Sequence, residues 1–215
     1  MTQVLIGPDS SQDLVAETIV LGGRDLEVLR PRDSEALLDE HAFEHEEFLP
    51  YWAELWPSGV ALARRVAARA LHGARTLELG CGLALPSMAA ALAGGRALAT
   101  DWSPRAIGLA RENAARNGLA LEVVRCAWEA PEPILAGAPW DLVLGADLLY
   151  EQRNADALLA LLPRLAGPRT EIWIADPGRP PAARFLERAA ERWTVDSTAD
   201  VALPQGAIHR LAPAG

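Results

Sequence analysis

Two glycines and an acidic residue are spaced like the ligand-binding groups of an α/β protein. Residues 75–79 have the apolar character of a buried strand, and Gly80-Cys81-Gly82 follow at once. A helix-like segment, 84–93, comes next, and the second apolar strand, 96–100, ends at Asp101, 21 positions after the first glycine. This order is typical of a mononucleotide-binding βαβ unit, in which the glycines let a ligand approach the backbone and the acid accepts the ribose hydroxyls.

Glu78, two residues before the first glycine, narrows the choice of ligand. A carboxylate at this strand end would repel a pyrophosphate, and Leu85 stands where a dinucleotide fingerprint would have its third glycine. The same carboxylate suits an ammonium and a sulfonium, and S-adenosylmethionine has both of these, a ribose and no phosphate. The pattern therefore predicts S-adenosylmethionine as cofactor. The alternative is an ordinary α/β turn whose glycines serve only the geometry of the backbone.

Composition restricts the partners and the surroundings of the chain. The 215 residues carry a formal net charge of −9 and no run of Lys or Arg, which disfavours nucleic acid and favours a neutral or cationic substrate. Two cysteines make no disulfide framework. We see neither a signal peptide at the first residues nor an apolar stretch of about 18 residues that would span a membrane. The expected location is the cytoplasm.

The elements that must position these residues form a doubly wound α/β sheet. Further strands are expected at 121–126, 140–150 and 170–176, separated by helical segments, and a final antiparallel pair at 193–197 and 207–212. Because the carboxyl ends of parallel strands meet at one edge, Gly80, Asp101, Asp147 and Asp176 should lie together there.

An N-terminal extension is predicted over residues 1–48, packed on an S-adenosylmethionine-binding domain over 49–215. Residues 18–30 have a hairpin pattern around Gly22-Gly23, and 33–48 predict an acidic helix that is either a solvated face or a rim attracting a basic substrate. His41 and His45 would share one face of that helix, but without a third ligand we predict no metal site.

Residues 49–59, "LPYWAELWPSG", form a tryptophan segment before a helix. Its tryptophans, Trp52 and Trp56, either pack in the core or form a wall of the ligand pocket. Ser58 is expected to cap the helix, which should continue to Gly73. Ser103 followed by Pro104 predicts the start of another helix.

Six motifs together resemble the seven-stranded, class I methyltransferases: "LPYWAELWPSG", "LELGCGL", "ATDWSP", "CAW", "GADLLY" and "ADPGR". More narrowly, they resemble the protein lysine methyltransferases that include the enzyme acting on the electron-transfer flavoprotein β subunit, a group whose bacterial members are also labelled nicotinamide N-methylases. The resemblance implies a Rossmann-like, doubly wound, seven-stranded sheet, mostly parallel with an antiparallel C-terminal strand.

The same resemblance implies roles for particular residues. The implied cofactor-binding residues are Trp56, Glu78, Gly80, Cys81, Gly82, Asp101, Trp102, Trp128 and Ala146. Asp147 and Tyr150, in an acid-x-x-aromatic motif, are implied to orient the substrate. Many relatives have an acid for the adenine amino group where this chain has Ala127.

Three functions follow as hypotheses. The first is a protein lysine N-methyltransferase, with the electron-transfer flavoprotein β subunit as one candidate partner. The second is a small-molecule N-methyltransferase acting on an amine or a nicotinamide-like pyridine. The third is a cofactor-binding regulator without turnover, which the missing acid at Ala127 would suit.

Overall fold

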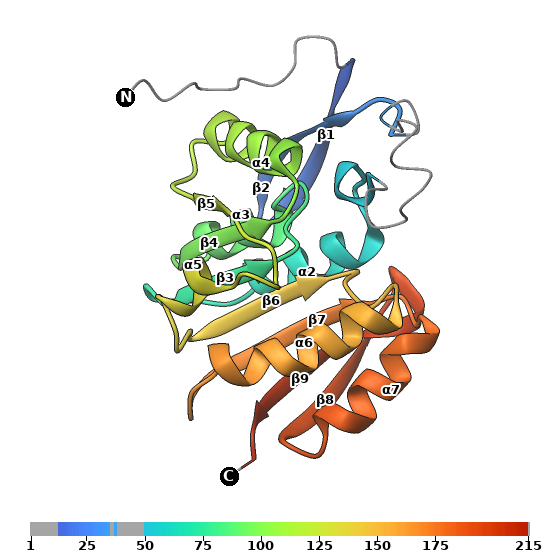
Figure 1. Cartoon of the computed structure of the whole chain (residues 1–215). Coiled ribbons are helices and arrows are strands. Elements are labelled where there is room, and N and C mark those ends of the chain that lie inside the picture. Colours follow the sequence, from blue (N-terminus) through green and yellow to red (C-terminus); the bar gives the residue numbers. More distant parts are fainter. Residues whose placement is uncertain (1–12, 35–36, 38–49, 215) are drawn as a thin grey trace.

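A mixed seven-stranded sheet forms the centre of the computed structural model, which describes residues 13–34, 37 and 50–214 (Figure 1). Its parallel strands, in spatial order, are β5 (Glu122–Arg125), β4 (Arg96–Asp101), β3 (Arg75–Leu79), β6 (Leu142–Ala146) and β7 (Glu171–Asp176). Strand β9 (Leu203–Pro213) pairs antiparallel with β7, and β8 (Trp193–Asp200) pairs antiparallel with β9. The predicted sheet is therefore confirmed.

Helices cover both faces of this sheet, as a doubly wound fold requires. One face carries α2 (Pro57–Ala67), α3 (Leu85–Leu92) and α4 (Pro104–Arg116), and the other carries α5 (Glu132–Leu135), α6 (Gln152–Leu165) and α7 (Pro180–Ala189). Alternate residues of β6 separate the two cores: Leu142 and Leu144 pack with α2 and α3, whereas Val143 packs with α6 and α7. Within the described ranges, none of the helices combines the length and apolarity that crossing a bilayer requires.

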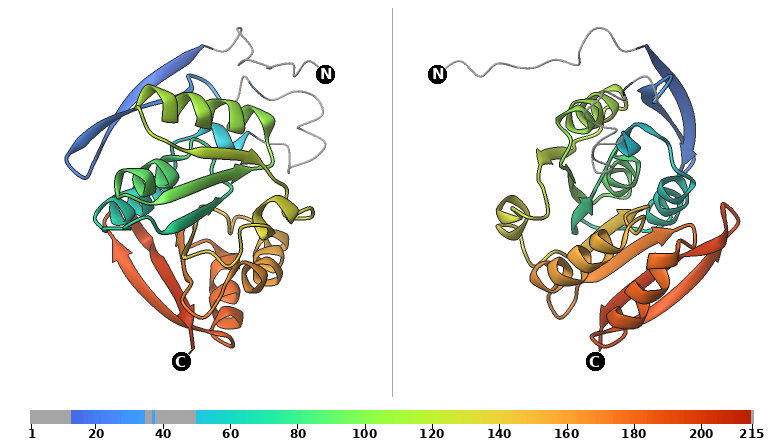
Figure 2. Two further views of the ribbon diagram at one scale, coloured as in Figure 1. Left: turned by 90° about the vertical axis from the view of Figure 1, so that its left-hand side faces the viewer. Right: turned by 45° about the vertical axis from the view of Figure 1, so that its right-hand side comes forward.

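The predicted N-terminal hairpin is confirmed and is longer than expected. Strands β1 (Leu14–Leu21) and β2 (Arg24–Pro31) pair over their whole lengths around two glycines with positive φ. Figure 2 shows the hairpin beside α4, on the opposite side of the sheet from α6. The predicted acidic helix, with His41 and His45, lies outside the described residues, apart from residues 33, 34 and 37. The boundary between residues 48 and 49 stays a prediction.

Two side-chain amides of α4 attach the hairpin to the sheet domain. Asn113 accepts from Leu29 N at 2.7 Å and donates to Leu29 O at 3.2 Å, and Asn117 makes the same pair of bonds with Glu27 at 2.9 and 2.8 Å. Asn113 Nδ2 also lies 3.3 Å from Leu83 O, directly after the glycine turn. One buried amide therefore connects the hairpin to the turn that the sequence marks as ligand-binding.

The prediction for the first helix was wrong at both ends. Helix α2 begins at Pro57 after Trp56, since proline lacks an N–H and fits the first helical position, so Ser58 lies inside the helix and does not cap it. The helix ends at Ala67 and not near Gly73, because Leu71 N turns away to bond Ala93 O. Ser103 does cap α4, accepting from Ala106 N at 3.4 Å, with Pro104 next to it.

Candidate active site

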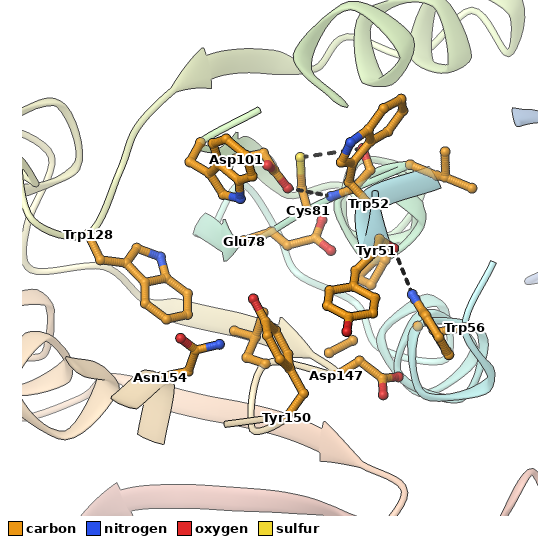
Figure 3. Close-up of a pocket in the computed structure, with 18 of the residues that line it drawn as sticks. Tyr51, Trp52, Trp56, Glu78, Cys81, Asp101, Trp128, Asp147, Tyr150 and Asn154 are labelled. Carbon is orange, nitrogen blue, oxygen red and sulfur yellow. Dashed lines mark hydrogen bonds between the residues drawn. The ribbon is translucent and has the colours of Figure 1, made fainter. Parts of the chain in front are cut away.

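A cavity of about 580 Å³ opens at the carboxyl ends of β3, β4 and β6 (Figure 3). All eleven predicted site residues line it: Trp56, Glu78, Gly80, Cys81, Gly82, Asp101, Trp102, Trp128, Ala146, Asp147 and Tyr150. Asp176, expected at the same edge, does not line the cavity and lies behind Asp147. The topology therefore gathers these predicted residues from five separate segments of the chain into one pocket.

The glycine turn has backbone dihedral angles that residues with a side chain rarely adopt. Gly80 and Gly82 have φ values of +57° and +49°, in the left-handed region. A Cβ on Gly82 would lie 3.0 Å from Trp52 O, so the tryptophan segment can pack directly against the turn. Gly82 N donates to Asp101 Oδ2 at 3.0 Å, which ties the turn to the end of β4.

Glu78 is buried at the end of β3 and contacts the first turn of α3. Its Oε2 accepts from Ser87 N at 2.8 Å and from Ser87 Oγ. Burial raises the pKa of Glu78 to about 8, although the bonds from Ser87 oppose this, and nearby Asp101 raises it further. A cation entering the cavity would favour the ionised form of this carboxyl group.

Asp101 lies at the end of β4 beside the glycine turn, and further aromatic and polar residues complete the lining of the cavity. The Asp101 carboxyl is buried, accepts from Ser103 N at 2.9 Å, and has a pKa raised by that burial. Trp102 and Trp128 both line the cavity, and so does Ala127, which contributes no acid. Glu129 and Asn154, which sequence reasoning missed, also line the cavity. Figure 3 shows Asn154 beside Trp128.

Three aromatic side chains surround the part of the cavity near Asp147. The Tyr51 ring centroid lies 5.2 Å from that of Tyr150 and 6.4 Å from that of Trp56. Trp56 Nε1 donates to Tyr51 O at 2.8 Å, which fixes the indole. Burial raises the pKa of the Tyr150 hydroxyl. This part of the cavity is therefore aromatic, with Trp56 and Tyr150 half-buried and Tyr51 41% exposed.

Asp147 has an unusual backbone conformation and a cationic partner. Its φ is +59°, a strained value for a residue other than glycine, and its N–H donates to Ala175 O at 2.9 Å. Its Oδ1 accepts from Arg179 Nη1, whereas its buried Oδ2 has no hydrogen-bond partner among the described residues. Asp147 thus presents a carboxylate with one oxygen still able to accept a donor.

Cys81 has no catalytic features. Its thiol is buried, and burial, together with the neighbouring carboxyl groups of Asp101 and Glu78, raises its pKa well above the ordinary value. A thiol with a raised pKa is a poor nucleophile at neutral pH. In the described part of the chain, no three His, Cys, Asp or Glu side chains gather as metal ligands would.

The fold and the cavity define a class of protein. Among solved structures, the ribosomal protein L11 methylase of Lactobacillus delbrueckii subsp. bulgaricus is similar with a TM-score of 0.57, at 21% identity, over 72% of this chain and 77% of that one. At this identity the likeness shows the fold alone, which is the Rossmann-like fold of class I methyltransferases.

The particular family follows from sequence comparison. The family model described as lysine methyltransferase matches residues 45–192, more than half of the chain, and the chain belongs to this family. The electron transfer flavoprotein beta subunit lysine methyltransferase of Xenopus laevis is 33% identical over 69% of this chain and 63% of its own length. The histone-arginine methyltransferase METTL23 of Mus musculus is 31% identical over 57% and 52%. The chain spans between half and two thirds of these curated relatives, and the predicted resemblance is confirmed.

Proposed function

We propose that the protein is an S-adenosylmethionine-dependent N-methyltransferase that methylates lysine side chains of a partner protein. One observation carries the proposal: a single cavity joins the glycine turn, Glu78 and Asp101 to the aromatic region around Asp147 and Tyr150. The first part suits a ligand with a cationic amino-acid end and a ribose. The second part suits an amine that must meet that ligand.

The residues of the first part fit S-adenosylmethionine. The cavity volume lies in the range of small-molecule sites, which is roughly 300–1,000 Å³. Glu78 would hold the ammonium group and Asp101 the ribose hydroxyls, and the backbone at Ala146 would support the ligand from below. Trp102 and Trp128 would flank the adenine. When bound, S-adenosylmethionine supplies a methyl group carried on a positively charged sulfur.

Binding residues at the methionine end would include the glycine turn and Trp56. Gly80, Cys81 and Gly82 line the cavity, and the two glycines, which have no side chain, would let the ligand approach the backbone closely. Trp56 lines the same cavity beside Tyr51, and it would contact the methionine end of the ligand and the acceptor.

The residues of the second part would prepare the acceptor amine. A lysine ammonium has an ordinary pKa of about 10.4, and only its neutral form has a lone pair that can take a methyl group. An aromatic, poorly hydrated environment favours the neutral form. Tyr51, Trp56 and Tyr150 supply that environment, and Asp147 would orient the amine and receive its proton.

The net charge of the chain and its similarity to protein methyltransferases support a protein acceptor. A net charge of −9 suits a basic segment of a partner and disfavours nucleic acid. The electron transfer flavoprotein β subunit is the first partner to test, since a relative named for that substrate matches this chain. We place the reaction in the cytoplasm, which suits two free cysteines.

The test is methyl transfer with isotopically labelled S-adenosylmethionine. The purified protein is incubated with the electron transfer flavoprotein β subunit and, separately, with extract of cells lacking this protein, and mass spectrometry locates the label. We expect labelled lysine in a protein, and far less label with the Asp101→Asn variant. Label confined to small amines or pyridines would favour the alternative hypothesis, and label on arginine would contradict lysine as the acceptor.

A further inference from the structure

We propose that Arg179 is a positioning residue for the methyl acceptor, acting from outside the cavity through Asp147 and Trp56. This inference rests on the proposed function. Arg179 does not line the cavity, yet it contacts two residues that do. No other described side chain is ion-paired with Asp147. The inference assigns a role to the "ADPGR" motif at the end of β7.

The position of Arg179 is fixed by the turn between β7 and α7. Asp176 Oδ1 accepts from both Gly178 N, at 2.7 Å, and Arg179 N, at 2.8 Å. Gly178 has a φ of +94°, and a Cβ there would lie 2.3 Å from Gln205 O of β9. The turn is thus held by the buried Asp176 carboxylate on one side and packs closely against β9 on the other. These contacts fix the backbone from which the Arg179 side chain extends.

The Arg179 side chain contacts residues at the ends of three separate elements. Its Nη1 donates to Asp147 Oδ1, after β6, and lies 3.8 Å from Asp176 Oδ2, at the end of β7. Its Cζ lies 5.8 Å from the centroid of the Trp56 ring, within the range of a cation–π contact. A planar guanidinium can meet a carboxylate and an aromatic face at once, which a lysine ammonium does less well.

The charges of this cluster leave one negative charge in excess. Two carboxylates share one guanidinium, and Oδ2 of both Asp147 and Asp176 is buried without a hydrogen-bond donor among the described residues. A buried carboxylate oxygen without a donor is costly, so a donor that arrives with the substrate is favoured. Of the two, only Asp147 lines the cavity, so the acceptor amine would meet Asp147.

Arg179 therefore determines which oxygen of Asp147 remains for the substrate. It occupies Oδ1 from the start of α7, so a donor on the acceptor would have to reach Oδ2, which is enclosed in this structure and has no donor among the described residues. It also lies against the Trp56 ring, which forms part of the aromatic wall. Loss of Arg179 would free the Asp147 carboxylate to reorient and would weaken the wall, while leaving Glu78 and Asp101 unchanged.

The test compares Arg179→Gln and Arg179→Lys with Arg188→Gln as matched control. Arg188 lies in α7, the helix that Arg179 precedes, and pairs with a carboxylate, Asp156, at 3.1 Å, and neither of these two residues lines the cavity. For each variant, the measurements are KM and kcat for the acceptor, the affinity for S-adenosylhomocysteine by calorimetry, and Tm. For Arg179→Gln we expect kcat/KM to fall by roughly 10- to 100-fold, since hydrogen bonds to charged groups contribute about 1.5–3 kcal/mol. Nucleoside binding should change by less than about twofold, and Arg179→Lys should recover part of the loss.

A double-mutant cycle with Asp147→Asn gives the decisive result. If Arg179 acts through Asp147, Arg179→Gln should cost little more once Asp147 is Asn. An equal cost in both backgrounds, or an equal loss of S-adenosylhomocysteine affinity, would overturn the inference. If Arg179→Gln does not fold, the cycle is run with Arg179→Lys. The proposed function is tested separately, and it fails if the wild-type protein methylates no lysine. The double-mutant cycle is then measured with whichever amine the protein does methylate.

Discussion

Glu78 is the residue whose protonation is most sensitive to the ligand. Its carboxyl is buried, its hydrogen bonds within the described residues come from Ser87 alone, and burial raises its pKa to about 8. Between the ordinary pKa of 4.5 and about 8, the folded protein holds a proton on Glu78 that the unfolded chain has lost. The contribution of Glu78 to stability therefore decreases as pH rises through this window.

Substitution Glu78→Gln should remove this pH dependence and weaken the binding of S-adenosylmethionine. In the wild type, a ligand ammonium would favour ionised Glu78, so binding at pH 7 should release a proton. The variant should release none and should bind roughly 10-fold or more weakly at pH 8. Calorimetry in two buffers of different ionisation enthalpy measures both quantities. Equal proton release by both proteins would show that Glu78 does not meet the cation.

Asp147→Asn should distinguish the two kinds of acceptor. An amine that gains a methyl group must lose a proton, whereas a pyridine nitrogen becomes a cation without one to lose. We therefore expect Asp147→Asn to lower kcat for a lysine acceptor by roughly 100-fold, a typical effect of a positioned acid or base. Binding of S-adenosylhomocysteine is the control and should be retained. Unchanged turnover would favour a pyridine acceptor.

At the scale of residues, sequence reasoning identified those whose type is unusual for their position. Glu78, the glycines and Asp101 stand at strand ends, where a charge or a positive φ needs a reason. Tyr51, Asn154 and Arg179 were not singled out. A tyrosine beside Trp52, or an asparagine in the first turn of α6, fits an ordinary surface as well, and only the topology brings them to the cavity. Arg179 acts from behind Asp147, a relation between β6 and β7 that spacing does not reveal.

At the scale of elements, the attachment of the hairpin to α4 depends on Asn113. Asn113→Ala would remove three hydrogen bonds and leave Leu29 N and Leu29 O without their partner. We expect a loss of about 2–4 kcal/mol in the free energy of unfolding, because buried groups left unpaired cost about 1–3 kcal/mol. Urea denaturation measures the loss. Arg105→Ala, on the exposed side of the same helix, is the control, and a loss no larger than the control's would contradict the role of Asn113.

Element boundaries were the least accurate part of the sequence prediction. Strands were placed well because apolar runs between helices have few alternatives in a doubly wound fold. The start of α2 was misplaced because both Ser58 and Pro57 are start signals, and the proline determined the register. The hairpin was underestimated at its first strand: the sequence prediction began at Thr18, whereas β1 begins at Leu14, and its exposed Ala16 and Thr18 do not mark a strand boundary.

At the scale of the whole molecule, a charged network links the segment after α2 to β7 and β9 on one face of the sheet. Glu171 of β7 accepts from Arg69 beyond α2 at 2.8 Å, from Arg210 of β9 at 3.0 Å, and from Trp173 Nε1 at 3.0 Å. Burial alone would raise the pKa of Glu171, but the bonds from Arg210 and Arg69 outweigh it and lower the pKa to about 2. This stabilisation is complete above the ordinary pKa of 4.5 and is lost as pH falls toward 2.

Glu171→Gln should therefore lower Tm at neutral pH and matter less in acid. Allowing for screening of these partly exposed side chains, we expect about 1–2 kcal/mol, which corresponds to roughly 2–6 °C in a protein of this size. Thermal unfolding followed by circular dichroism at pH 7 and at pH 3 measures the difference. Glu187→Gln, on the exposed face of α7, is the control. A Tm difference that stays constant between the two pH values would contradict the lowered pKa.

The position of β9 has a consequence for the order in which the protein folds. Strand β8 precedes β9 in the chain, yet β9 lies between β7 and β8 in the sheet. Strand β8 can join the sheet only through β9, its antiparallel partner, so the sheet is not complete until β9 has paired with β7. Until then β7 is an open edge, and open edges attract strands of other molecules. The step that places β9 is thus the one at which correct folding competes with aggregation.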